Sequence, residues 1–218
     1  MGIDSKTPKQ VLTGFLFGAI AMVAIFGIQI LLGFIKIDRF VWQDANIQKS
    51  VLNIIDSIIL YSAAAFLEEI AFRGYIYQEF KSKFNIYISL LLSGLLFDFT
   101  HVFNAGFGLD FVIQGIIASA FFLLLRNYTG NLWASTGFHI AWNIFQGVVL
   151  GLATYKMADF SSVIYLSSQS GPAWIVGNAP SIESGLLYGL VYVVGSAVLF
   201  KLMNRNPDNY NPKKTSTS

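Results

Sequence analysis

Four polar side chains that can do hydrolytic chemistry lie within apolar stretches of the sequence: Glu68, His101, His139 and Asn143. A glutamate beside a histidine can act as a general base that takes a proton from water. A second histidine and an amide can donate hydrogen bonds to the oxyanion that forms when this water attacks a carbonyl. Alternatively, Glu68, His101 and His139 match the ligand set of a catalytic zinc ion with one open position. The residue types therefore predict hydrolysis, with either a free or a zinc-bound water.

Helical spacing predicts different positions for the two adjacent glutamates. Glu69 and Arg73 are four residues apart, in the order that favours an ion pair within one helix. Glu68 points about 100° away from Glu69, because a helix has 3.6 residues per turn, and it is left to face a cavity. His139 and Asn143 are also four residues apart and share one helix face. We expect Glu69 and Arg73 to support the site and the other three to line it.

The composition indicates a membrane protein. Of 218 residues, 55% are hydrophobic and 12% are charged, whereas a soluble domain has roughly 25% charged residues. The net charge of +2 is too small for nucleic-acid binding. The chain has no cysteine, which excludes disulfides, thiol nucleophiles and cysteine-ligated zinc. An all-α polytopic membrane helix bundle is the predicted fold class.

About six transmembrane helices are expected from the apolar segments. Their approximate ranges are 10–35, 51–77, 84–103, 111–125, 131–152 and 184–203. The second, third and fifth carry the buried ionisable residues, which in a membrane are functional candidates by default. At a rise of 1.5 Å per residue, overlapping depths in the membrane are expected for the four candidate residues Glu68, His101, His139 and Asn143. Asp98 lies three residues before His101, and we expect its carboxylate to hydrogen-bond the ring.

The same segments divide the chain into three parts and suggest its orientation. Residues 1–50 are an N-terminal transmembrane helix and a loop, 51–152 are the catalytic core, and 153–218 are a loop, the last transmembrane helix and a polar tail. With six spans, both termini share a side of the membrane. That side carries nine Lys and Arg residues against four on the other, which predicts cytoplasmic termini.

Three motifs in order along the chain resemble those of the CPBP or Abi family, which groups CAAX proteases with bacteriocin-processing and immunity proteins. Residues 68–73 fit E-E-x-x-x-R, residues 97–101 fit F-x-x-x-H, and residues 139–143 fit H-x-x-x-N. Each motif lies on its own predicted span. The chain is similar to the small bacterial members of the family, which implies a bacterial cell membrane as its location.

The resemblance implies an intramembrane endopeptidase of CAAX-type or leader-peptide-processing activity. Its substrate would be a membrane-associated peptide or protein. Glu68 would activate the water and His101 would share it, while His139 and Asn143 would form the oxyanion site. Glu69 and Arg73 would support the first motif. Both a metalloprotease and a metal-free glutamate mechanism are open for this family, so no cofactor is certain and zinc is possible.

Two other functions fit parts of the pattern. An immunity or regulatory membrane protein would use the same fold to bind a peptide or a partner. A small transporter or proton relay would also place Glu and His inside the membrane. The sequence has no inverted repeat of the kind many transporters show, which favours the endopeptidase.

Overall fold

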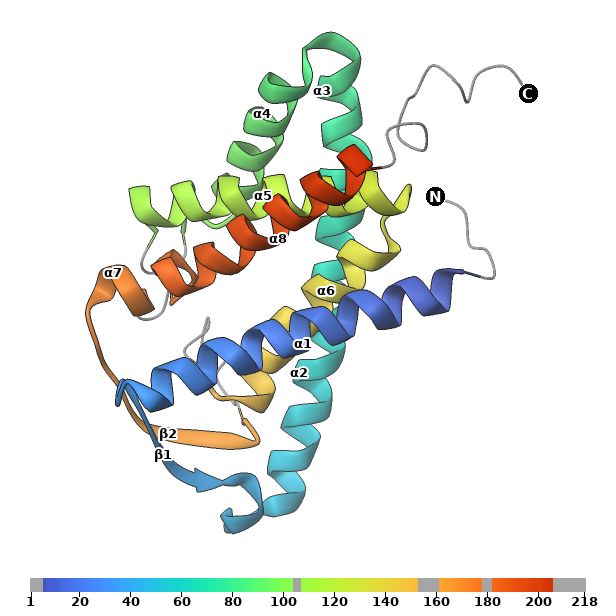
Figure 1. Cartoon of the computed structure of the whole chain (residues 1–218). Coiled ribbons are helices and arrows are strands. Elements are labelled where there is room, and N and C mark those ends of the chain that lie inside the picture. Colours follow the sequence, from blue (N-terminus) through green and yellow to red (C-terminus); the bar gives the residue numbers. More distant parts are fainter. Residues whose placement is uncertain (1–5, 104–106, 153–160, 178–181, 206–218) are drawn as a thin grey trace.

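The computed structural model describes residues 6–103, 107–152, 161–177 and 182–205 as a helix bundle with one small sheet (Figure 1). In chain order its elements are α1 (Thr7–Leu31), β1 (Ile35–Phe40), η1 (Val41–Gln43), α2 (Ile47–Glu68), η2 (Glu69–Ile76), α3 (Tyr77–Lys83), α4 (Ile86–Phe99), α5 (Leu109–Thr129), α6 (Trp133–Asn143), η3 (Ile144–Val149), β2 (Ile164–Gln169), α7 (Ala173–Val176), η4 (Ile182–Ser184) and α8 (Leu186–Arg205). The predicted all-α membrane bundle is confirmed.

Among the described residues, four helices are long and apolar enough to cross a membrane: α1, the continuous helix Ile47–Lys83, α5 and α8. The predicted count of six spans is not confirmed. Helix α4 has 14 residues and is about 21 Å long at 1.5 Å per residue, against a hydrocarbon core of about 30 Å. Helix α6 has 11 residues, and most of them are buried among the other helices.

Helices α2 and α3 form one rod, because η2 continues the helix between them without a break (Figure 1). The rod starts at Asn46, whose side chain accepts a hydrogen bond from the backbone N–H of Lys49 at 3.0 Å. Asn85 caps α4 in the same way. Asparagine at this position satisfies N–H groups that lack a partner within the helix. These caps define the helical hairpin that carries the first two motifs.

Helix α1 packs closely on α6 through small residues. A Cβ at Gly14 would overlap the carbonyl oxygen of Ala134, and one at Gly137 would overlap that of Val11. Small residues at membrane helix interfaces let two backbones approach closely. This contact fixes α6, which carries the third motif, against the N-terminal helix.

An aromatic core surrounds α6. The ring of Phe138 lies 4.9 Å from that of Phe121, and the ring of Trp142 lies 4.8 Å from that of Tyr192. All four side chains are buried. Aromatic pairs in this range add to the stability that burial provides. Helices α5 and α8 are thereby held against the face of α6 that carries Phe138 and Trp142.

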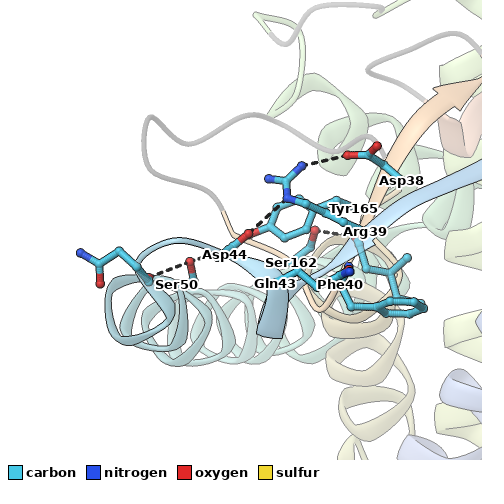
Figure 2. A network of polar contacts seen from close by, with 10 residues as sticks. Asp38, Arg39, Phe40, Gln43, Asp44, Ser50, Ser162 and Tyr165 are labelled. Carbon is cyan, nitrogen blue, oxygen red and sulfur yellow. Dashed lines mark hydrogen bonds and ion pairs between the residues drawn. The ribbon is translucent and has the colours of Figure 1, made fainter.

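Strands β1 and β2 form an antiparallel pair that the sequence did not lead us to expect. Both fall in segments predicted as loops. Beside this sheet, Asp44 accepts hydrogen bonds from the hydroxyls of Ser50 and Tyr165, each at 2.7 Å (Figure 2). Arg39 lies 3.2 Å from the same carboxylate, with its guanidinium 4.0 Å from the centre of the Tyr165 ring. This network joins the sheet to the start of α2.

Candidate active site

One cavity of about 230 Å³ is lined by all four of the side chains that the sequence singled out. Glu68 comes from the end of α2, His101 from the turn after α4, and His139 and Asn143 from α6. The motifs are separate in sequence and meet in space. A cavity with a largely apolar lining into which a few polar side chains converge is a candidate active site.

Glu69 and Arg73 lie behind the cavity as a buried ion pair, as their spacing predicts. Their closest atoms, Oε1 and Nη1, are 3.3 Å apart, and both side chains are almost wholly excluded from solvent. Arg73 also donates from Nη2 to the hydroxyl of Ser119 at 3.3 Å. Its guanidinium lies 4.4 Å from the ring centre of Phe97 and 5.0 Å from that of Phe122. The buried charge is thus neutralised and enclosed on several sides.

His139 lies between the two adjacent glutamates. Its Nδ1 is 3.1 Å from Oε1 of Glu69, and its Nε2 is 3.5 Å from Oε2 of Glu68. A carboxylate can only accept a hydrogen bond, so Nδ1 carries the proton that it donates to Glu69. Glu69 therefore fixes the orientation of the ring and aims Nε2 toward Glu68 and the cavity.

The two glutamates differ sharply in exposure. The side chain of Glu69 is fully buried, whereas 28% of the Glu68 side chain is accessible. A ligand in the cavity can consequently reach the carboxylate of Glu68 but not that of Glu69.

His101 occupies a different setting from the one we expected. Its Nδ1 lies 3.2 Å from the carbonyl oxygen of Phe97 and 3.0 Å from the hydroxyl of Thr100. The predicted hydrogen bond from Asp98 is wrong, because neither carboxylate oxygen of Asp98 has a hydrogen-bond partner among the described residues. Helix α4 ends at Phe99, so the ring turns back onto the last helical carbonyls while Asp98 points toward α5.

Two segments of π-helix adjoin the site and were not predicted. Segment η2 begins at Glu69, directly after Glu68, and η3 begins at Ile144, directly after Asn143. A π-helical turn contains more residues than an α-helical one and is frequent at functional sites. Segment η2 therefore contains Glu69 and Arg73 of the first motif, whereas η3 follows the third motif.

Sequence reasoning also missed Glu183 on η4, which lines the cavity. Its Oε1 accepts a hydrogen bond from Nε1 of Trp142 at 2.7 Å. Gln114 and Gln146 line the cavity too. The position of Glu183 in a loop between apolar segments is the one signal that could have drawn attention to it.

The side chains do not fit a metal ion well. No three His, Asp or Glu side chains in the described part of the chain come close enough together to hold one. Glu68, His101 and His139 share the cavity without forming such a cluster. Zinc therefore enters none of the steps proposed below.

The family comparison covers the part of the chain that carries the three motifs. Residues 50–145 match the family described as Rce1-like, type II CAAX prenyl endopeptidase. No curated protein matches the chain, and no solved structure matches it. The match supports, in general terms, a membrane-embedded endopeptidase of the CAAX type. The segment 50–145 is therefore similar to the Rce1-like endopeptidases, which confirms the CPBP family resemblance of the sequence motifs.

Proposed function

We propose that this protein hydrolyses a peptide bond of a membrane-associated protein or peptide, with Glu68 as the base that activates water. The observation that carries the proposal is the shared cavity, in which Glu68 meets His101, His139 and Asn143. Glu68 is the accessible member of the glutamate pair. A general base must reach the proton that it removes, and Glu69 is enclosed.

In the proposed reaction, water binds between Glu68 and His101. Glu68 removes a proton from this water as its oxygen bonds to the carbonyl carbon of the substrate. The carbonyl oxygen becomes an oxyanion, which accepts hydrogen bonds from the amide of Asn143 and from Nε2–H of a His139 ring protonated on both nitrogens. Protonated Glu68 then gives its proton to the leaving nitrogen as the C–N bond breaks. The products are a carboxylic acid and an amine, and Glu68 is restored.

The test is cleavage of a peptide library by the purified full-length protein in lipid nanodiscs. Glu68→Gln should lower the rate by about 10²–10⁴-fold, the usual contribution of a general base. Glu79→Gln is the matched control, because Glu79 is an exposed glutamate on α3. Full activity of a folded Glu68→Gln protein would rule out the mechanism.

Metal content measured on the same samples addresses the zinc alternative. We expect substoichiometric zinc and no loss of cleavage after chelation. A full equivalent of zinc that disappears together with activity would favour the metalloprotease mechanism. If neither protein cleaves any peptide while both protect cells from a bacteriocin, the immunity function becomes the better account.

We also propose that both ends of the chain lie in the cytoplasm of a bacterial cell. Helix α1 begins and α8 ends on the same side of the molecule (Figure 1). The excess of Lys and Arg that the six-span prediction assigns to that side supports the orientation.

A further inference from the structure

The cavity contains buried hydrogen-bond acceptors that lack donors. Asp98 is 1% exposed, and neither of its carboxylate oxygens has a hydrogen-bond partner in the described structure. Gln146 is 5% exposed, and its Oε1 also lacks one there, as does Oε1 of Gln114. All three residues line the cavity. A buried acceptor without a donor costs free energy, so these oxygens point to a donor-rich ligand.

Asp98 reaches this position because α5 has a glycine opposite it. A Cβ at Gly115 would overlap the Asp98 carboxylate. The side chain therefore fills space that any larger residue on α5 would take. This arrangement places a carboxylate in the cavity wall, away from the His101 ring with which it might have paired.

Glu183 adds a further carboxylate from η4, just before the last helix, α8. The hydrogen bond from Trp142 holds one of its oxygens, and the residue lies on the cavity wall. Position 183 is outside the family match at 50–145. No Lys or Arg is among the described residues that line the cavity. The wall thus has three carboxyl groups, from Glu68, Asp98 and Glu183, and no lining Lys or Arg. Arg73 lies behind the wall, where it is paired with Glu69.

From these observations we infer that the cavity contains a subsite for a cationic group of the peptide substrate, formed by Asp98, Gln146 and Glu183. This inference rests on the proposed function and adds a specificity to it. An ammonium has three N–H donors and a guanidinium has five, and neither has an acceptor. Such a group supplies the donors that these oxygens lack, and it offsets the carboxylate charge. The cation is a Lys or Arg side chain, or the α-ammonium of the peptide.

The test measures peptide binding to the full-length protein in nanodiscs, in the Glu68→Gln background so that cleavage does not interfere. The probes are pools of N-acetylated decapeptides with Lys, Arg, Glu or norleucine at one fixed position, and a norleucine pool with a free α-amine. We expect the Lys or Arg pools, or the free-amine pool, to bind about tenfold more tightly than acetylated norleucine, as for one charged hydrogen bond. Which pool binds more tightly identifies the source of the cation.

Variants of the subsite then decide its location. Glu183→Gln and Asp98→Asn should each reduce the preference for the cation, whereas Glu79→Gln should leave it unchanged. Glu183→Lys should shift the preference toward the Glu pool, an effect that loss of structure alone would not produce. Gly115→Ala, which displaces the Asp98 carboxylate, should act like Asp98→Asn. A cooperative thermal unfolding transition is the criterion that each variant is folded.

Two results would overturn the subsite. One is equal binding of cationic and neutral pools by the protein with its native Asp98 and Glu183. The other is a cation preference that survives in both Glu183→Gln and Asp98→Asn. The proposed function is judged separately, by cleavage of any pool by the wild-type protein, and so the two can fail independently.

Discussion

Oε1 of Glu69 lies 3.1 Å from Nδ1 of His139, which follows it by 70 residues in the sequence. The same oxygen is 3.3 Å from Nη1 of Arg73. One buried carboxylate therefore links the first motif to the third. Its four-residue spacing from Arg73 predicted only a local ion pair, but in the structure the same carboxylate also contacts a histidine of the site.

Glu69→Gln should destabilise the protein strongly. The substitution leaves Arg73 buried without its anionic partner, and loss of one member of a buried pair costs about 3–5 kcal/mol. Thermal or denaturant unfolding in nanodiscs measures the change. Glu79→Gln is the matched control, because Glu79 and Lys83 have the same spacing but are exposed and 4.0 Å apart. We expect a change within about 1 kcal/mol there. Equal changes in the free energy of unfolding for Glu69→Gln and Glu79→Gln would show that burial does not make the Glu69–Arg73 pair more important for stability.

Asn143→Ala should lower kcat by about 10²–10³-fold with little change in KM, the pattern for loss of an oxyanion donor. Asn143→Asp should be at least as harmful, since it replaces the donor with a negative charge beside the oxyanion. Steady-state kinetics on a cleaved library peptide give both constants. If Asn143 only joins helices, both variants would instead unfold at lower temperature while retaining kcat.

Gly14→Ala should destabilise the bundle even though alanine is the better helix former. The added Cβ would overlap the backbone of Ala134 on α6, and overpacking of this kind costs about 1–3 kcal/mol. Gly27→Ala on the same helix is the control, because nothing lies within 4 Å of a Cβ there. We expect the control to be neutral or stabilising by about 0.5–1 kcal/mol. Unfolding midpoints of the two variants should move in opposite directions.

Single cysteines can determine the orientation of the chain, because the native sequence has none. Lys9 precedes most of α1, and Lys49 lies near the start of α2. With cytoplasmic termini, an impermeant thiol reagent added outside intact cells should label Lys49→Cys and spare Lys9→Cys. The opposite labelling pattern would reverse the orientation. Lysed cells provide the control, since both positions should then react.

The sequence was sufficient to predict much of the helical framework. Apolar runs indicate helices wherever the described structure has long ones, and the four-residue spacing of Glu69 and Arg73 predicts their ion pair. The span count was less predictable, because apolar composition does not separate a helix that crosses lipid from one that is wrapped by protein. Helix α6 is of the second kind, with Phe138, Ala141 and Trp142 all buried.

Other features depend on tertiary contacts that no local pattern specifies. The alternation Ile-Lys-Ile-Asp at positions 35–38 is a weak strand signal, but β1 needs β2, more than a hundred residues away, as its partner. The π-helical segments and the approach of Glu183 to Trp142 are set by packing around the cavity. The prediction for Asp98 was wrong because its spacing suggested His101 as a partner. Its carboxylate instead lies in the space opposite Gly115.

The last prediction concerns Asp44 at the edge of the small sheet. Hydrogen bonds from the hydroxyls of Ser50 and Tyr165, with Arg39 nearby, hold the pKa of its carboxyl below the usual value. A carboxyl with a lowered pKa in the folded state stabilises the protein above its unfolded pKa, near 4, and this stabilisation is lost as the pH falls through the folded value. Asp44→Asn should therefore lower the unfolding temperature at pH 7, and the difference from wild type should shrink below about pH 4. Asp38→Asn is the control, because Asp38 contacts Arg39 from an exposed position and should change the unfolding temperature little. A difference between Asp44→Asn and wild type that stays constant from pH 7 to pH 3 would mean that the carboxylate charge does not stabilise this network.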